Sequence, residues 1–106
     1  MHAAMGEITA SELETRLREG EKLSVIDVRE PDEWESGHIK EAVSIPLSVF
    51  VERVGELNGM EEPLYMVCRS GNRSGKACDY LSAQGYEVVN VLGGMLSWPG
   101  EVETGN

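Results

Sequence analysis

The feature that most constrains the fold is the alternation of short apolar runs with segments of helical periodicity. Runs typical of buried strands lie near Glu7 and Ile8 and at residues 23–28, 42–45, 64–67 and 87–91. Parallel strands need long crossover connections, and these are usually helices, so the alternation is typical of a parallel sheet covered by helices. The sequence therefore predicts an α/β fold with five strands.

Hydrophobic spacing predicts two of the connecting helices. Residues 47–57 have the pattern of an amphipathic helix with Phe50, Val51 and Val54 on its apolar face. Residues 74–84 form the other helix, and Gly85 stands where a glycine commonly follows a helix end. The second of these helices begins directly after the most informative loop of the chain.

The length of 106 residues has room for one compact domain, residues 1–106, with residues 1–5 and 100–106 expected as tails. The longest uninterrupted apolar run covers five residues, 64–68, which is far too short for a transmembrane helix. The first residues resemble no secretory signal, and Met5 could be the natural start. With only two cysteines, these features indicate the cytoplasm.

The net charge of the chain disfavours polyanionic partners, but one stretch of the sequence is locally basic. A formal net charge of −10 makes the chain a poor binder of nucleic acids or anionic membranes. Arg69, Arg73 and Lys76 nevertheless lie close together, with no acidic residue between Glu62 and Asp79. We therefore expect a local anion site in this stretch.

The residues 68–74, Cys-Arg-Ser-Gly-Asn-Arg-Ser, join a predicted strand to a predicted helix. This order places Cys68 at the carboxyl end of a parallel strand, where open α/β sheets bind ligands. A tight loop entering a helix directs several backbone N–H groups at one point, and Gly71 supplies the freedom such a loop needs. Amide dipoles and two arginines would favour the Cys68 thiolate, which is a nucleophile.

Other readings of the candidate residues stay open. Cys68 could simply end its strand as a small buried residue, and Cys78, inside the following helix, is expected to be structural rather than a redox partner of Cys68. His38 could act as a base toward Cys68, but a hydrogen bond that orders its loop is the preferred interpretation. The scattered cysteines and histidines lack the spacing of a metal site, and no cofactor is expected.

Two glycine-containing segments imitate nucleotide-binding motifs. Residues 71–77 have one residue too few for a phosphate-binding P-loop, and Ala77 stands where a metal-binding Ser or Thr is required. Gly93 and Gly94 lack the spacing of a dinucleotide-binding fingerprint. Neither segment predicts a nucleotide site.

Together, five ordered segments resemble the rhodanese family. They are Val25–Pro31 (VIDVREP), Glu33–Ile39 (EWESGHI), Ala42–Pro46 (AVSIP), Cys68–Ser74 (CRSGNRS) and Leu92–Met95 with Trp98 (LGGM…W). The resemblance covers nearly the whole chain. One departure is Lys40-Glu41, where many members have Pro-Gly, and it affects a turn rather than the loop chemistry.

The resemblance implies an α/β, rhodanese-like three-layer sandwich: a five-stranded, mostly parallel sheet with helices on both faces. It also implies a thiosulfate sulfurtransferase in which Cys68 takes the outer sulfur of thiosulfate or another sulfane donor and passes it to cyanide or a thiol, such as that of a thioredoxin-like protein. Asp27 and Arg29 would support the loop region without reacting. The residues expected to bind the donor are Arg69 and Arg73, with the backbone amides from Arg69 through Ser70, Gly71, Asn72 and Arg73 to Ser74.

Three other functions remain as alternatives. Cysteine phosphatases and arsenate reductases of related fold place five residues between cysteine and arginine, whereas four separate Cys68 from Arg73. A regulatory binding module is disfavoured because the cysteine is present. A persulfide carrier that serves a partner protein would share the sulfur chemistry. The sequence fixes neither the physiological donor and acceptor nor the oligomeric state.

Overall fold

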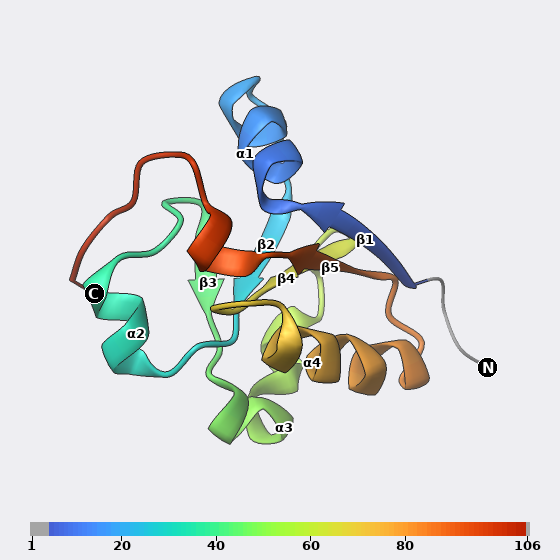
Figure 1. Cartoon of the computed structure of the whole chain (residues 1–106). Helices are drawn as coiled ribbons and strands as arrows, with labels where there is room; N and C mark the ends of the chain where they lie inside the picture. The colour runs from blue at the N-terminus through green and yellow to red at the C-terminus, as the bar shows by residue number, and fades with distance from the viewer. Residues whose placement is uncertain (1–4, 106) are drawn as a thin grey trace.

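The computed structural model describes residues 5–105 and contains one five-stranded sheet (Figure 1). Its strands stand in the order β1-β5-β4-β2-β3, and all four neighbouring pairs are parallel. The predicted α/β class and strand number are confirmed, and the sheet is fully parallel. The strands are β1 (Met5–Thr9), β2 (Ser24–Asp27), β3 (Ala42–Ser44), β4 (Leu64–Val67) and β5 (Val88–Leu92).

Helices cover both faces of this sheet, as the sandwich architecture requires. In Figure 1, α1 lies on one side of the strands, and α3 and α4 lie on the other. None of the helices in the described part of the chain combines the length and apolar character that a membrane span needs. The helices are α1 (Ala10–Arg18), α2 (Pro31–Ser36), α3 (Phe50–Arg53) and α4 (Asn72–Ala83), with short 3₁₀ helices η1 (Leu47–Val49), η2 (Val54–Leu57) and η3 (Gly94–Ser97).

The side chains of the central strand divide between two hydrophobic cores. Leu64 and Met66 of β4 pack with residues of α3 and α4, whereas Tyr65 and Val67 pack with residues of α1. Successive residues of a strand point to opposite faces of the sheet, so a strand buried on both sides reads as a continuous apolar run. This explains why residues 64–67 were predicted correctly although they do not alternate in polarity.

The segment of residues 47–57 differs from the single helix predicted for it. The structure divides it into η1, α3 and η2, because the backbone at Val49 and Arg53 departs from helical geometry, with φ of −123° and −105°. Phe50 is buried, as expected, but Val51 is 62% exposed, so its assignment to the apolar face was wrong. Val51 lies about 100° around a helix from Phe50, beyond the stripe that contacts the sheet.

The C-terminal residues, expected as a tail, are held against the domain by backbone hydrogen bonds. They lie outside any named helix or strand, but the backbones of Glu103 and His38 exchange two hydrogen bonds of 2.8 Å. The Gly105 amide also donates to the Glu35 carbonyl at 2.8 Å. Residues 101–105 are therefore fastened beside α2. The expected N-terminal tail, residues 1–5, lies outside the described residues except for Met5, which begins β1.

Parallel pairing brings the carboxyl ends of three adjacent strands to one edge of the sheet. Asp27 at the end of β2 pairs with Val67 at the end of β4, and β5 borders β4 on the other side. The loop after β4 is therefore flanked by the segments that follow β2 and β5. Any site at Cys68 is built from all three.

Candidate active site

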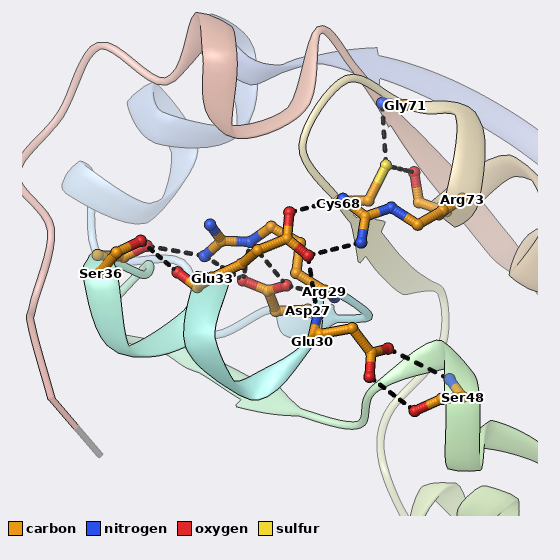
Figure 2. A network of polar contacts seen from close by, with 11 residues as sticks. Asp27, Arg29, Glu30, Glu33, Ser36, Ser48, Cys68, Gly71 and Arg73 are labelled. Atoms are coloured by element: carbon orange, nitrogen blue, oxygen red, sulfur yellow. Dashed lines mark hydrogen bonds and ion pairs between the residues drawn. The ribbon is translucent and has the colours of Figure 1, made fainter.

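Cys68 begins the loop between β4 and α4, and its sulfur is enclosed by that loop. The residue is only 1% exposed. The Gly71 amide donates a hydrogen bond to Cys68 Sγ at 3.0 Å, and the Ser74 hydroxyl lies 3.3 Å from the same sulfur (Figure 2). Gly71 has a φ of +108°, a left-handed conformation that favours glycine, and it immediately precedes the first residue of α4. The predicted enclosure of the sulfur by the Cys68 loop, residues 68–74, is observed.

The surroundings of Cys68 favour its thiolate. Burial is the largest single influence and raises the thiol pKa. Hydrogen bonds from the Ser74 hydroxyl and from the backbone amides of Ser74, Gly71 and Ser70 lower it, and together they outweigh burial. The net result is a pKa below that of an ordinary cysteine. These hydrogen bonds therefore favour the thiolate, which is the nucleophilic form of cysteine.

Asn90 on β5 braces the Cys68 loop, and sequence reasoning missed it. Its side-chain oxygen accepts a hydrogen bond from the Ser74 hydroxyl at 2.6 Å. Its side-chain nitrogen donates to the Gly71 carbonyl at 3.2 Å. One amide therefore connects the middle of the loop with the first turn of α4. The available signal was a polar residue inside the otherwise apolar strand of residues 88–92.

The segment after β5 donates two backbone hydrogen bonds to the Cys68 loop. The Met95 amide donates to the Cys68 carbonyl at 2.9 Å, and the Leu96 amide donates to the Arg69 carbonyl at 3.0 Å. A side chain at Gly94 would place its Cβ 2.7 Å from the Arg69 carbonyl oxygen. Gly94, the second glycine of the pair that imitated a nucleotide motif, is thus needed for close approach to the Cys68 loop.

The two arginines of the loop differ in their surroundings. The Arg69 side chain is exposed and has no hydrogen-bond or ion-pair partner within residues 5–105. Arg73 instead forms a double hydrogen bond with Glu33 of α2, with N–O distances of 2.6 and 2.8 Å (Figure 2). Arg73, which was expected to hold the anionic donor together with Arg69, is thus already paired with a carboxylate. Its pairing could not be predicted, because Glu33 lies 40 residues earlier in the chain.

The side chains of Ser70 and Asn72 are exposed. Neither forms a hydrogen bond to Cys68 Sγ through its side chain within the described residues. The contribution of Ser70 comes from its backbone N–H, which lowers the pKa of Cys68, and Asn72 opens α4. The expected participation of the loop backbone thus has a structural counterpart for Ser70, Gly71 and Ser74.

Asp27 and Arg29 form a buried ion pair beneath the site, consistent with their predicted supporting role. Arg29 Nη2 lies 2.8 Å from Asp27 Oδ2 and 2.7 Å from the Gly37 carbonyl, so the pair ties the end of β2 to the end of α2 (Figure 2). His38 is buried as well, with Nδ1 2.8 Å from the Trp34 carbonyl oxygen and its ring stacked on that of Trp34. These contacts agree with the interpretation of His38 as a loop-ordering residue.

Cys78 contrasts with Cys68. It is fully buried within α4, and burial, followed by the nearby charges of Asp79 and Cys68, raises its pKa to about 12. Both cysteines are free thiols. Within residues 5–105, His, Cys, Asp and Glu side chains form no group of three that could hold a metal ion. Cys78 therefore packs in the core, as expected for this position of the helix, and its burial favours the neutral thiol.

Comparisons with known proteins agree with this geometry. Residues 9–101 match the Rhodanese-like domain family. The chain is 40% identical over 100 residues to YtwF of Bacillus subtilis, covering 94% of this chain and 96% of that protein. It is 36% identical over 95 residues to a protein of Allochromatium vinosum named "Sulfurtransferase", covering 89% of this chain and 88% of the other. A rhodanese-like domain protein from Staphylococcus aureus superimposes with a TM-score of 0.86 at 36% identity, covering 96% and 100% of the two chains.

Proposed function

The chain belongs to the rhodanese-like domain family, and from this premise we propose that it is a sulfurtransferase in which Cys68 carries sulfane sulfur as a persulfide. The observation that carries the proposal is the enclosure of Cys68 Sγ by donors. The Gly71 amide and the Ser74 hydroxyl lie 3.0 and 3.3 Å from the sulfur. These donors, with the start of α4, favour a negative charge on sulfur.

The proposed reaction has two displacement steps. In the first, the Cys68 thiolate forms a bond with the outer sulfur of thiosulfate, the S–S bond of thiosulfate breaks, and sulfite leaves with the electron pair. In the second, cyanide or a thiolate attacks the outer sulfur of the Cys68 persulfide, and the Cys68 thiolate leaves. Atoms and charge balance in each step, and neither step needs an external oxidant or a cofactor.

The Cys68 loop is expected to stabilise the negative charge of both the thiolate and the persulfide. In the resting enzyme, the amides of Ser70, Gly71 and Ser74 stabilise the thiolate. After the first step the negative charge moves to the outer sulfur, one bond beyond Cys68 Sγ. Arg69, which is exposed and unpaired within the described residues, is the guanidinium best available to a donor at the rim. The hydrogen bonds that lower the Cys68 pKa favour deprotonation, which is the task that a general base would otherwise have.

The physiological partners are expected to be thiols. The acceptor in the cell would be a low-molecular-weight thiol or the thiol of a thioredoxin-like protein, with cyanide serving in the assay. Both cysteines of this chain are free, so a reducing compartment such as the cytoplasm suits the reaction. A carrier that receives sulfur from a partner protein would use the same Cys68 persulfide.

The test is intact mass after incubation with thiosulfate or a thiol persulfide, followed by removal of the donor. We expect the mass of one sulfur atom to be gained and then lost on addition of cyanide or thiol. Cys68→Ser should gain no sulfur, whereas Cys78→Ser, the matched control, should gain it as the wild type does. If Cys68→Ser still became loaded, or if the wild type took no sulfur from either donor, the proposal would be wrong.

A further inference from the structure

The ion pair between Arg73 and Glu33 stands beside the reactive sulfur. Arg73 lies in the first turn of α4, and its two terminal nitrogens face the two carboxylate oxygens of Glu33 at 2.6 and 2.8 Å. Figure 2 shows this pair next to Cys68. The Arg73 guanidinium binds the carboxylate through two N–H groups. It would use the same two groups to bind the oxygens of an anionic sulfur donor. Glu33 therefore occupies the face of the Arg73 guanidinium that could otherwise bind an anion.

Glu33 is held in this position by its own helix. The Glu30 amide donates to Glu33 Oε1 at 3.1 Å, and Glu30 is itself fixed by the Ser48 hydroxyl at 2.7 Å from its carboxylate. The side chains of Glu33 and Arg73 are only 26% and 31% exposed. The pair is thus a built contact between two helices rather than a chance pairing of mobile surface chains.

The pair stays charged over the whole useful pH range. The hydrogen bond from Arg73, opposed by partial burial and aided by the Glu30 amide, lowers the pKa of Glu33 to about 2. The positive charge of Arg73 is therefore neutralised at any pH at which the protein works. A small dianion approaching Cys68 gains nothing from Arg73 unless it displaces Glu33, and it also meets the overall charge of −10.

We propose that Glu33 is a specificity-determining residue that disfavours small dianionic donors and leaves the persulfide of a thiol as the preferred donor class. This inference rests on the proposed sulfur transfer through Cys68. The Cys68 thiolate bonds to the outer sulfur of the donor R–S–SH, the S–S bond of the donor breaks, and RS⁻ leaves with the electron pair. Such a donor relies on the loop amides and does not need the Arg73 fork.

The first measurement compares donors on the wild type. With a low-molecular-weight thiol persulfide and with thiosulfate, kcat/KM should favour the persulfide by at least about tenfold, the value of one charge-assisted contact. A wild type that used thiosulfate as efficiently as the persulfide would overturn the inference. This comparison needs no variant.

The second measurement uses Glu33→Gln, which keeps the shape of the side chain and removes its charge. Freed from the carboxylate, Arg73 should lower KM for thiosulfate about tenfold, whereas kcat/KM for the persulfide should change less than about twofold. Glu56→Gln is the matched control, because Glu56 pairs with Arg53 in the same way at a distance from Cys68 and carries the same charge. It should leave both donors unchanged.

A double variant shows whether the gain depends on Arg73. In Glu33→Gln combined with Arg73→Ala, KM for thiosulfate should return to about the wild-type value, because the wild-type pair and the double variant are both neutral. If the double variant kept the improved KM, or if Glu33→Gln gave no improvement, the inference would be wrong. Failure of the wild type to load sulfur on Cys68 from either donor, seen by intact mass, would instead refute the proposed function.

Discussion

Ser74 stands between Cys68 and Asn90: its hydroxyl oxygen lies 3.3 Å from Cys68 Sγ and 2.6 Å from Asn90 Oδ1. A hydroxyl has one proton and cannot donate to both neighbours at once. When Cys68 is a thiol, the proton can point to Asn90 and the oxygen can accept from the thiol. When Cys68 is a thiolate, the hydroxyl can turn toward the sulfur. Ser74 thus adapts to the charge on sulfur without moving its backbone.

This relationship predicts the effect of Ser74→Ala. Loss of the hydroxyl removes the largest of the contributions that lower the Cys68 pKa, so the pKa should rise toward that of an ordinary cysteine. The measurement is the pH dependence of alkylation by iodoacetamide. Ser70→Ala is the matched control, since Ser70 acts through its backbone amide, and it should leave the midpoint in place. Equal midpoints for Ser74→Ala and the wild type would show that the hydroxyl does not stabilise the thiolate.

The wild type should show a low midpoint in the same titration. Because the folded protein lowers the Cys68 pKa, the midpoint of alkylation should lie at a lower pH than that of the same thiol in the unfolded chain. Cys78, whose pKa is raised to about 12, should stay unmodified in the folded protein. Peptide mapping after alkylation distinguishes the two thiols. Modification of Cys78 before Cys68 would contradict the assignment.

Gly94→Ala should damage both stability and activity. Gly94 has a φ of +52°, and an added Cβ would lie 2.7 Å from the Arg69 carbonyl oxygen. Strain and overpacking of this kind cost about 2 kcal/mol or more, which corresponds to a loss of about 10 °C in Tm for a domain of this size. Gly55→Ala is the control, because a Cβ there meets nothing within 4 Å. Similar Tm values for both variants would show that the close approach at Gly94 tolerates a side chain.

Asp27→Asn should destabilise the fold far more than the loss of a surface pair. It leaves the Arg29 charge buried without its partner, which costs about 3–5 kcal/mol. Glu56→Gln breaks an exposed pair of the same chemical type and should cost less than about 1 kcal/mol. Urea denaturation monitored by tryptophan fluorescence measures both free energies. A loss below about 1 kcal/mol for Asp27→Asn would mean that the surroundings of Arg29 relax to admit water.

Arg69, the exposed arginine of the Cys68 loop, is expected to contribute to thiosulfate binding. Arg69→Ala should raise KM for thiosulfate by about tenfold, because Arg69 is exposed and unpaired among the described residues. The persulfide of a thiol should be affected less, because the loop amides hold its outer sulfur. Steady-state kinetics with both donors on the folded variant makes the comparison. An unchanged KM for thiosulfate would assign Arg69 to the solvated surface alone.

The parts of the site that lie within one continuous stretch were predictable, and those that join distant stretches were not. A run of four apolar residues, a glycine-containing turn and a helical pattern were enough to place Cys68 at the carboxyl end of β4. The roles of Asn90 and Glu33 depend on β5 and β2 being the two neighbours of β4, and strand order cannot be derived from local patterns. The error at Val51 has the same origin, since only packing decides where the apolar stripe of a short helix ends.

The pairing of Glu103 with His38 has a practical consequence for anyone who attaches this protein to something else. The C-terminal residues run beside α2, the helix whose Glu33 meets Arg73 at the reactive loop (Figure 1). A purification tag, a fluorescent fusion or a surface anchor joined at that end would pull on the backbone that secures α2. The same attachment at the other end would act on β1, which lies at the edge of the sheet and is separated from β4 by β5. Immobilised or fused forms should therefore be built from the N-terminus.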